Sequence, residues 1–349
     1  MMAMDAFDRQ LLNVIQGAVP LERQPFGRLA GELGRDEADV LRRVRALRKA
    51  GIIREISAIF DAVSLGYRQA LVAMSVPAES LDRAGQIAAG HPGVSHCYGR
   101  AGKVNLWLTL AVSPRSGLGL EGTADLLAQL VGATSPLVLP TIRRYKLRVH
   151  FDMETGQAAP TARGTGRAAP AQSGPGDNPP PAPLDEAQVR AIRALQTDLP
   201  ATGDPFEEIA AAAGLDVDDL LSAGREFLAD GRMRRYAAVL HHRAAGSAAN
   251  LLVAWRADAK QADAVGPRAA EVAGVSHCYL RPAGPDWPYT LYTMIHGRSE
   301  QDCRLAVDQI VATTALREHV ELWTTAEFKK RRVPLFGPEE AQWERRHAK

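Results

Sequence analysis

The sequence predicts an α+β fold made of two tandem repeats, and three observations lead to this prediction. The six residues 93–98, with the sequence GVSHCY, recur letter for letter at 274–279. Residues 156–183 contain seven Pro, five Gly and seven Ala but no Val, Ile, Leu, Met or aromatic residue, so this segment has no side chains for a core. The chain has 349 residues, enough for about two domains. It therefore divides into two halves joined by a flexible Pro/Gly/Ala linker.

Further matches between the halves indicate an internal duplication. The pair Pro-Phe at 25–26 is matched by Pro-Phe at 205–206. These matches keep an offset of about 180 residues, which indicates two homologous units rather than a solenoid. Residues 1–155 carry a net charge of +4, and residues 184–349 carry a net charge of −3. The opposite charges favour docking of one half on the other.

The first segment of each half is predicted to be a winged helix-turn-helix domain. In the first half, apolar residues at helical spacing predict helices over residues 5–16, 26–33 and 37–50. Gly34 and Gly51 end the second and third helices, and residues 52–60 then form a strand. Three helices followed by a strand are typical of a winged helix-turn-helix.

The rest of each half has the order βαββαβ, which is the ferredoxin-like unit. In the first half we expect strands at 68–76, 94–100, 104–112 and 137–149, with helices at 80–89 and 122–131. The second half repeats the order at 249–255, 262–273, 275–281, 289–296, 300–313 and 320–333. The predicted domains are therefore helix-turn-helix segments at 1–64 and 184–244, ferredoxin-like segments at 65–155 and 245–337, the linker at 156–183, and a tail at 338–349.

Composition excludes several classes of protein. The chain is 46% hydrophobic and 23% charged, close to the soluble globular average. No window holds 18 apolar residues, and the first ten residues lack the basic and apolar regions of a signal peptide. We therefore expect a cytoplasmic protein without a membrane span. A net charge of +2 does not indicate a nucleic-acid coat.

Cysteine and histidine usage does not predict a metal site. The three cysteines, Cys97, Cys278 and Cys303, are too few and too scattered for a disulfide framework or a CxxC metal site. His241 and His242 are adjacent, but neighbours on a strand face opposite ways and do not form a metal pair.

Two short rows of polar residues repeat on the predicted strands. The first row is His96, Tyr98 and Arg100, and the second row is His277, Tyr279 and Arg281. Alternate side chains of a strand share one face, so the members of each row lie together. An imidazole, a phenol and a guanidinium in a row are unusual for a buried sheet face unless they are paired or functional. Cys97 and Cys278 point to the opposite face, and we expect them to be core residues.

The combined pattern resembles a known family. A helix-turn-helix followed by a ferredoxin-like domain is the plan of the Lrp/AsnC regulators, and residues 25–56 are similar to their DNA-binding part. The ligand-domain motifs are more specific and resemble the siroheme decarboxylases of heme d1 and alternative heme biosynthesis. The motifs that carry this resemblance are HCYGR (96–100), NLWLTL (105–110), HCYLRP (277–282), PDWPY (285–289) and EFKKR (327–331).

The resemblance implies a carboxy-lyase that removes CO2 from the C12 and C18 acetate side chains of siroheme and gives 12,18-didecarboxysiroheme. The family usually has two related subunits, and here both types would be fused, so that the halves pair as an intramolecular pseudo-dimer. The resemblance implies no cofactor and no metal site, because the iron enters with the siroheme substrate. The implied partners are siroheme and its decarboxylated products, without a specific nucleic acid or a membrane.

Two departures from the family pattern concern the sites. Val104 stands where many first-type subunits have Tyr, and residues 143–146 (RRYK) correspond to residues 327–330 (EFKK) at the ends of the halves. The two rows are therefore expected to be unequal. Whether one row or both rows act stays open at this point.

A siroheme substrate suits the residues of this chain. Siroheme is a flat apolar disc with eight carboxylates, so its site needs an apolar slot and a rim of cations. The candidate substrate-binding residues are Asn105, Trp107, Arg143, Arg144, Lys146, Arg148, Arg234, Arg235, Trp287, Tyr289, Lys329 and Arg331.

The rows carry the groups that the implied reaction needs. Loss of CO2 leaves an electron pair that must be protonated, and a His with a pKa near 6.5 is suited to this at neutral pH. We expect His96 or His277 to be the general acid, with the tyrosines and arginines of the rows orienting the substrate. The alternative is a His that ligates the substrate iron, and a ligating nitrogen does not also donate the proton.

Two other functions fit parts of the sequence. A transcription regulator would use the third helix of the first half, which carries Arg42, Arg43, Arg45, Arg48 and Lys49. The third helix of the second half begins DVDD (216–219), which repels DNA, so the chain lacks two similar reading heads. A tetrapyrrole carrier without catalysis would have the same slot and rim, and product analysis separates it from an enzyme.

Overall fold

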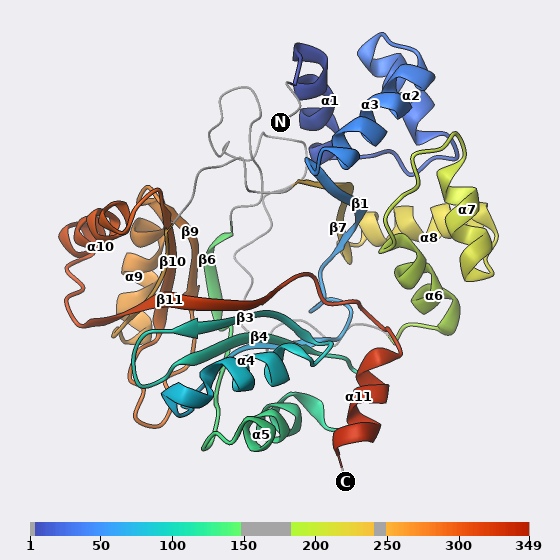
Figure 1. The fold of residues 1–349 in the computed structure, drawn as a ribbon. Helices are drawn as coiled ribbons and strands as arrows, with labels where there is room; N and C mark the ends of the chain where they lie inside the picture. Colours follow the sequence, from blue (N-terminus) through green and yellow to red (C-terminus); the bar gives the residue numbers. More distant parts are fainter. Residues whose placement is uncertain (1–3, 148–182, 241–248, 349) are drawn as a thin grey trace.

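A computed structural model describes residues 4–147, 183–240 and 249–348 and confirms the predicted α+β fold of two repeats (Figure 1). Residues 156–182 of the predicted linker, Arg148, and the pair His241 and His242 lie outside the described residues. Among the described helices, none is both long enough and apolar enough to cross a membrane.

The helix-turn-helix segments have helix ends that their local sequence favours. Asp5 and Asp185 begin the first helix of each half with a capping box, in which the Asp side chain accepts a backbone N–H. Pro25 and Pro205 stand at the start of the second helix, where no N–H is needed. The elements are α1 (Ala6–Gly17), α2 (Pro25–Leu33), α3 (Glu37–Lys49) and β1 (Ile53–Phe60), then α6 (Glu186–Leu195), α7 (Pro205–Ala213), α8 (Val217–Ala229) and β7 (Met233–Leu240).

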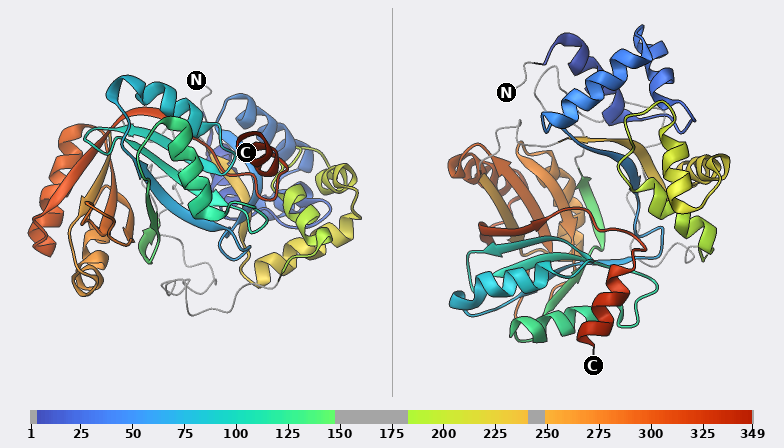
Figure 2. Two further views of the ribbon diagram at one scale, coloured as in Figure 1. Left: turned by 90° about the horizontal axis from the view of Figure 1, so that it is seen from below. Right: turned by 45° about the vertical axis from the view of Figure 1, so that its right-hand side comes forward.

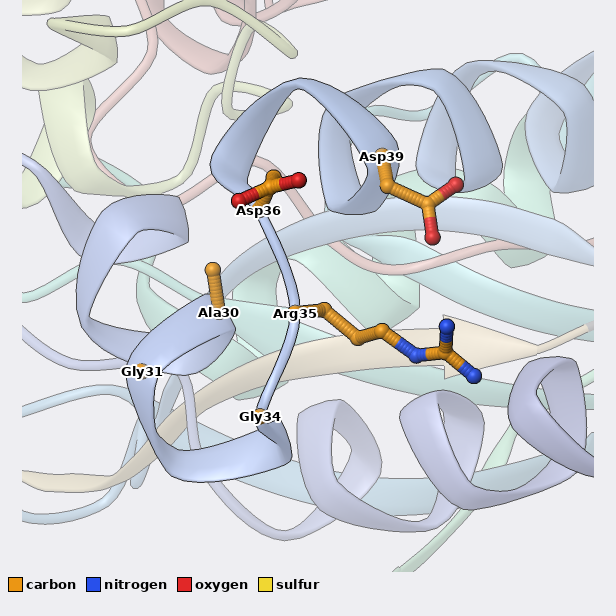
Figure 3. Close-up of a pocket in the computed structure, with 6 residues that line it drawn as sticks. All are labelled: Ala30, Gly31, Gly34, Arg35, Asp36 and Asp39. Carbon is orange, nitrogen blue, oxygen red and sulfur yellow. The ribbon is translucent and has the colours of Figure 1, made fainter.

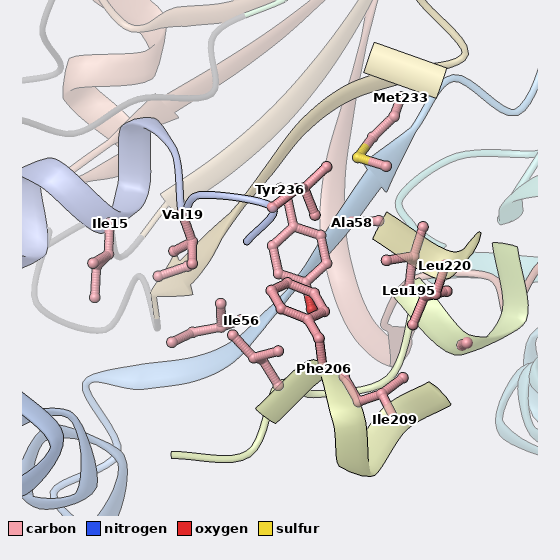
Figure 4. Close-up of a cluster of buried hydrophobic side chains, with 14 of the residues drawn as sticks. Ile15, Val19, Ile56, Ala58, Leu195, Phe206, Ile209, Leu220, Met233 and Tyr236 are labelled. Carbon is pink, nitrogen blue, oxygen red and sulfur yellow. The ribbon is translucent and has the colours of Figure 1, made fainter. Parts of the chain in front are cut away.

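The two helix-turn-helix segments share one core. β1 and β7 pair antiparallel as a two-stranded ribbon, with Ile56 opposite Ala238. Figure 4 shows Ile56 and Ala58 in one cluster with Phe206 and Tyr236 of the second half, whose rings lie 5.3 Å apart. Because each large apolar side chain contributes about 1.5–3 kcal/mol when fully buried, this core strongly favours docking of the halves.

Cations of α3 contribute to the same docking. The Arg45 Nε donates to the Ala201 carbonyl oxygen at 2.9 Å, and Arg48 forms an ion pair with Asp198 at 2.7 Å. Asp198 also accepts the Ile56 N–H at 2.7 Å. Two of the five cations that a DNA-reading helix would present are therefore engaged by the second half, which supports a structural role for α3.

The remaining strands of both halves join in one nine-stranded sheet. Its order is β5-β2-β4-β3-β11-β8-β10-β9-β6. Figures 1 and 2 show α4 and α5 on the outer side of the first-half strands, and α9 and α10 on the outer side of the second-half strands. The first-half elements are β2 (Arg68–Met74), the short 3-10 helix η1 (Ala78–Ser80), α4 (Leu81–Ala89), β3 (Val94–Arg100), β4 (Leu106–Val112), α5 (Gly119–Val131), β5 (Leu137–Pro140) and β6 (Arg143–Leu147). The second-half elements are β8 (Ala249–Trp255), α9 (Ala259–Glu271), β9 (Val275–Leu280), β10 (Leu291–Gly297), α10 (Glu300–Thr314) and β11 (His319–Lys330).

Each half lends its last strand to the other half. β11 pairs with β8 of its own half through residues 319–323 and with β3 of the first half through residues 324–330. The predicted single strand at 137–149 is instead two strands, because β5 pairs with β2 and β6 crosses to β9. Pro140, at the end of β5, has no N–H with which to extend the ladder. The prediction of one strand here is therefore wrong.

The exchange also corrects the alignment of the two strand ends. Arg144 lies opposite Tyr279, and Glu327 lies opposite Tyr98, so Arg144 and Glu327 occupy equivalent positions. The sequence alignment set Arg143 against Glu327 and is one residue out of register. Register in a sheet depends on the partner strand, and the partner strands are known only from the fold.

The predicted tail contains a helix, α11 (Glu339–His347), that packs on the first half. Trp343 is 4% exposed, and its ring lies 4.3 Å from the ring of His91. The Glu340 carboxylate accepts the Ser113 N–H at 3.1 Å. Burial, with a further contribution from Glu344, raises the pKa of Glu340 to about 7.

We predict that Glu340→Gln changes how stability depends on pH. A raised pKa means that the folded state holds the proton more tightly, so the wild-type free energy of unfolding falls as the pH rises from about 4.5 through about 7. The Gln variant lacks this titration. Its melting temperature relative to wild type should therefore rise between about pH 5 and about pH 8. The exposed neighbour variant Glu339→Gln is the control, and a difference that is flat with pH for Glu340→Gln would contradict the prediction.

Candidate functional site

The two rows occupy the face of the sheet that the helices leave uncovered. Cys97 and Cys278 are fully buried, and their thiols point at the carbonyl oxygens of Gly85 in α4 and Gly266 in α9. The expectation that these cysteines are core residues is confirmed. Since neighbouring strand residues face opposite ways, the histidines and tyrosines of the rows lie on the other face.

The two rows have nearly the same internal geometry. The imidazole and phenol centroids are 6.2 Å apart in the His96–Tyr98 pair and 6.1 Å apart in the His277–Tyr279 pair, with the rings stacked in both. The Nδ1 of each His lies within hydrogen-bond distance of the hydroxyl of the preceding Ser, at 3.0 Å in the first row and 2.8 Å in the second. The Ser contact orients each ring so that Nε2 is the nitrogen left for other partners.

Both histidines are neutral at pH 7 in the ligand-free protein. Burial, with contributions from the nearby charges of Lys330 and Arg54, lowers the pKa of His96 to about 4. Burial also lowers the pKa of His277 to about 4, with contributions from His296, His96 and Lys146. Among these neighbours, Lys330, Arg54 and Lys146 give the imidazoles a positive potential, which a bound anion would reverse.

The arginines of the rows have no carboxylate partner in the described part of the chain, and Arg100 is buried while Arg281 is partly buried. Arg100 is 3% exposed, and its pKa is lowered to about 10 by burial. Burial also lowers the pKa of Arg281. The buried Nε of each arginine has no hydrogen-bond partner among the described atoms. Burying a charge without a partner costs free energy. A bound anion would therefore stabilise both arginines.

Each row arginine is held by the opposite half. The Arg100 Nη1 donates to the Leu322 carbonyl oxygen at 2.8 Å and to the Thr324 hydroxyl at 3.1 Å, both on β11. The Arg281 Nη1 donates to the Leu139 carbonyl oxygen on β5 at 2.6 Å. Each guanidinium also lies over the tyrosine ring of its row, 5.3 Å away in the first and 5.0 Å in the second. The strand exchange thus fixes both guanidinium groups in place.

A basic cleft of about 580 Å3 opens beside the first row, where Lys330 lies opposite His96. Five cations and two carboxylates line it, so its surface favours a polyanion. The lining residues are Arg54, Glu55, Gly90, Pro92, Lys330, Arg331, Arg332, Pro334, Glu339 and Arg346.

Of these cleft cations, only Arg331 is among the substrate-binding residues predicted from the sequence. A signal for Lys330 and Arg332 was present, because they belong to the charge run 329–332. Arg54 precedes Glu55 in β1 at the position that matches Arg234 of the repeat. Arg346 of α11 was not signalled, because its place in the cleft depends on how the terminal helix docks.

The aromatic residues predicted to bind the substrate form part of the core between the halves. The Trp107 and Trp287 ring centroids are 5.5 Å apart, and Tyr289 packs edge-on against Trp287 at 4.9 Å. Trp107 and Trp287 are 1% and 8% exposed. Trp107 Nε1 donates to the Val104 carbonyl oxygen at 2.8 Å. In this structure these rings therefore support the uncovered face rather than offering open walls.

Several predicted rim residues bind groups within the protein. Arg143 pairs with Asp263, and Arg234 pairs with Asp61. Lys146 donates to the Ala270 carbonyl oxygen, and Lys329 donates to the Ala89 and His91 carbonyl oxygens. The Asn105 side-chain amide accepts the Val76 N–H and donates to the Val76 carbonyl oxygen. Arg144 lies beside Tyr279. Arg235 lies beside Arg234 and Arg332. Arg148 lies outside the described residues. Fewer cations therefore act together with the rows than the sequence predicted.

Another hollow, of about 410 Å3, lies at the turn between α2 and α3 (Figure 3). Its lining residues include Gly34, Arg35, Asp36 and Asp39, and it contains no predicted site residue. Within the described ranges, no group of three or more His, Cys, Asp or Glu residues could hold a metal ion.

Comparison with known proteins identifies the family. The family described as AsnC-like ligand binding domain matches residues 64–146 and 244–329, and the Siroheme decarboxylase NirDL-like HTH domain matches residues 8–54. A siroheme decarboxylase from Hydrogenobacter thermophilus is 34% identical over 337 residues, which cover 97% of each chain. This chain belongs to the siroheme decarboxylase family of enzymes.

Other members of the family match in the same way. The siroheme decarboxylase NirDL subunit of Paracoccus pantotrophus is 32% identical, over 95% of this chain and 97% of that protein. The separate beta subunit of Desulfovibrio desulfuricans is 39% identical but matches only 42% of this chain, over 92% of its own length. The match to a separate subunit over less than half of the chain fits the fused, single-chain form of the family.

Solved structures agree with this assignment. The crystal structure of the siroheme decarboxylase NirDL superposes with a TM-score of 0.79 at 30% identity, covering 99% of this chain and 98% of that chain. A second NirDL structure, in co-complex with an iron-uroporphyrin III analogue, gives the same TM-score and identity over 99% of both chains.

We predict that Arg281→Met weakens the binding of an iron porphyrin with eight carboxylates at least about tenfold, because it removes a desolvated cation. The control is Arg256→Met, whose guanidinium forms an exposed ion pair with Glu318 at 2.8 Å. Loss of an exposed pair should change affinity by less than about twofold. Absorbance titration with iron uroporphyrin measures both. Equal affinities in the two variants would contradict an anion-binding role for Arg281.

Proposed function

We propose that this protein is a siroheme decarboxylase that removes CO2 from the C12 and C18 acetate side chains of siroheme and releases 12,18-didecarboxysiroheme. The observation that supports this most directly is the pair of anion-seeking arginines, each in register with a tyrosine and a histidine. Family membership supports the choice of substrate, since relatives carry the name siroheme decarboxylase.

The proposed reaction needs a proton but no added electrons. The bond between the acetate methylene and its carboxylate breaks, CO2 leaves, and the electron pair stays on the methylene carbon, where it is conjugated with the pyrrole ring. One proton then converts the methylene into a methyl group. Each CO2 released therefore consumes one proton. We propose that no separate cofactor is needed, because the tetrapyrrole itself delocalises the electron pair.

The histidines are the proposed proton donors. Each is neutral before substrate arrives, because burial and cationic neighbours depress its pKa to about 4. A polycarboxylate placed among these cations compensates them and raises the imidazole pKa, so the His takes up a proton as the substrate binds. The captured proton is then available to the methylene carbon.

The tyrosines and arginines hold the acetate in the proposed mechanism. Burial raises the pKa of Tyr98 and the pKa of Tyr279, so both phenols remain hydrogen-bond donors at neutral pH. Arg100 and Arg281 are already fixed by carbonyl oxygens, so little side-chain entropy is lost when a carboxylate binds. We also propose that the enzyme acts in the cytoplasm and that its two halves pair as a pseudo-dimer.

We predict that His96→Ala and His277→Ala each reduce the release of CO2 from siroheme at least about a hundredfold at the row affected, in line with the usual contribution of a general acid. The assay is anaerobic incubation with siroheme followed by mass analysis for the loss of one or two CO2. His319→Ala is the control, because this histidine packs on Trp255. Full activity in both single variants and in the double variant would exclude the proposed role.

We also predict that siroheme binding takes up protons at pH 7. The sign follows from the pKa of about 4 in the free protein: both histidines start unprotonated, and the bound anion raises their pKa. Calorimetry in two buffers with different ionisation enthalpies counts the protons. Uptake should fall in the His96→Ala/His277→Ala double variant. If wild type and double variant take up the same number, the histidines are not the groups that titrate.

A further inference from the structure

The exchanged strands place opposite charges at the same point of the two rows. Glu327 of β11 lies opposite Tyr98, and Arg144 of β6 lies opposite Tyr279. The neighbouring residues establish that these positions are equivalent. Phe328 packs over Gly85 of α4 as Tyr145 packs over Gly266 of α9.

The lysine that follows each aromatic ring shows the same equivalence. Lys329 donates to the Ala89 carbonyl oxygen at the end of α4, and Lys146 donates to the Ala270 carbonyl oxygen at the end of α9. The two strand ends thus make the same contacts on their helix side. They differ on the uncovered side, where one presents a carboxylate and the other a guanidinium.

These charges act on the row tyrosines. Burial is the main cause of the raised pKa of Tyr98, and the Glu327 carboxylate raises it further through its charge and a hydrogen bond. In the second row, Arg144 opposes the effect of burial on the pKa of Tyr279. The first row therefore meets a negative neighbour where the second row meets a positive one.

The ribbon above the sheet repeats this difference. Glu55 of β1 lines the basic cleft beside the first row. The repeat places Arg235 at the matching position of β7, after Arg234, whose charge also acts on Tyr279. The first row therefore has the carboxylates of Glu327 and Glu55 nearby, whereas the second row has the guanidinium groups of Arg144 and Arg234.

We propose that the two rows act in a fixed order, with Arg144 and Glu327 as the residues that set it. The second row takes the fully carboxylated substrate first, because Arg144 adds a guanidinium within the row itself, whereas the residues that line the basic cleft do not include those of the first row. The first row takes the monodecarboxylated intermediate, because Glu327 repels an edge that still carries all of its carboxylates. Each row releases one CO2 and adds one proton to the methylene carbon. This inference rests on the proposed decarboxylase function.

Enzymes with one working row test the order. His96→Ala retains the second row, and His277→Ala retains the first. With siroheme, His96→Ala should release one CO2 and accumulate the monodecarboxylated product. His277→Ala should leave siroheme largely unconverted but decarboxylate the product isolated from His96→Ala. If both variants consume siroheme at the same rate, or the preferences are reversed, the order is wrong.

Charge exchange then tests the two proposed residues. In the His277→Ala background, Glu327→Arg should shift the ratio of kcat/KM values toward siroheme by at least about tenfold. In the His96→Ala background, Arg144→Glu should shift the ratio toward the monodecarboxylated intermediate by a similar factor. Glu327→Gln and Arg144→Gln should give smaller shifts in the same directions. An unchanged ratio in all four variants, each with a wild-type melting curve, would remove these residues from the proposal.

A matched control separates a local charge effect from a general one. Glu321 lies on the same strand as Glu327, but its carboxylate accepts the Trp323 indole N–H at 2.9 Å. Glu321→Gln in the His277→Ala background should leave the ratio unchanged, and a shift equal to that of Glu327→Arg would overturn the assignment. The failure of the underlying function has a different signature, because the wild-type protein would then release no CO2 from siroheme.

Discussion

The pairing of β11 with β3 and of β6 with β9 is the constraint on which the rest of the structure depends. These ladders are made of backbone hydrogen bonds between halves, so neither row is completed by its own repeat alone. Leu322 and Thr324 hold Arg100 from the second half, and Leu139 holds Arg281 from the first. A half without its partner would lack these contacts, and fusion on one chain keeps the two halves together.

The row arginines lower the stability of the ligand-free fold. A guanidinium removed from water without a carboxylate partner costs several kcal/mol, offset here only in part by carbonyl oxygens and tyrosine faces. The same arrangement prepares the site, because the cations are in place before a ligand arrives. An anionic tetrapyrrole would recover that cost as binding energy, whereas a neutral ligand would not.

The helix-turn-helix segments have a role that their fold name does not suggest. Arg45 and Arg48 of α3 bind Ala201 and the Asp198 carboxylate, so the helix that reads DNA in the related regulators is used here for docking. The ribbon that results carries Arg54 to the cleft beside His96. The helix-turn-helix segment thus forms part of the wall of this cleft, in keeping with a function that resides in sites rather than in folds.

The sequence by itself determined the repeat, most helices and strands, and the shared face of each His-Tyr-Arg row, because these follow from local periodicity and an exact hexapeptide match. It also carried the family resemblance in motifs such as HCYGR. Only the tertiary structure decided that the last strands are exchanged, that Glu327 and not Phe328 matches Arg144, and that Arg143, Lys146 and Lys329 are bound within the protein. The physical reason is that strand partners, register and burial of charge depend on contacts between residues far apart in the chain, which local periodicity does not encode.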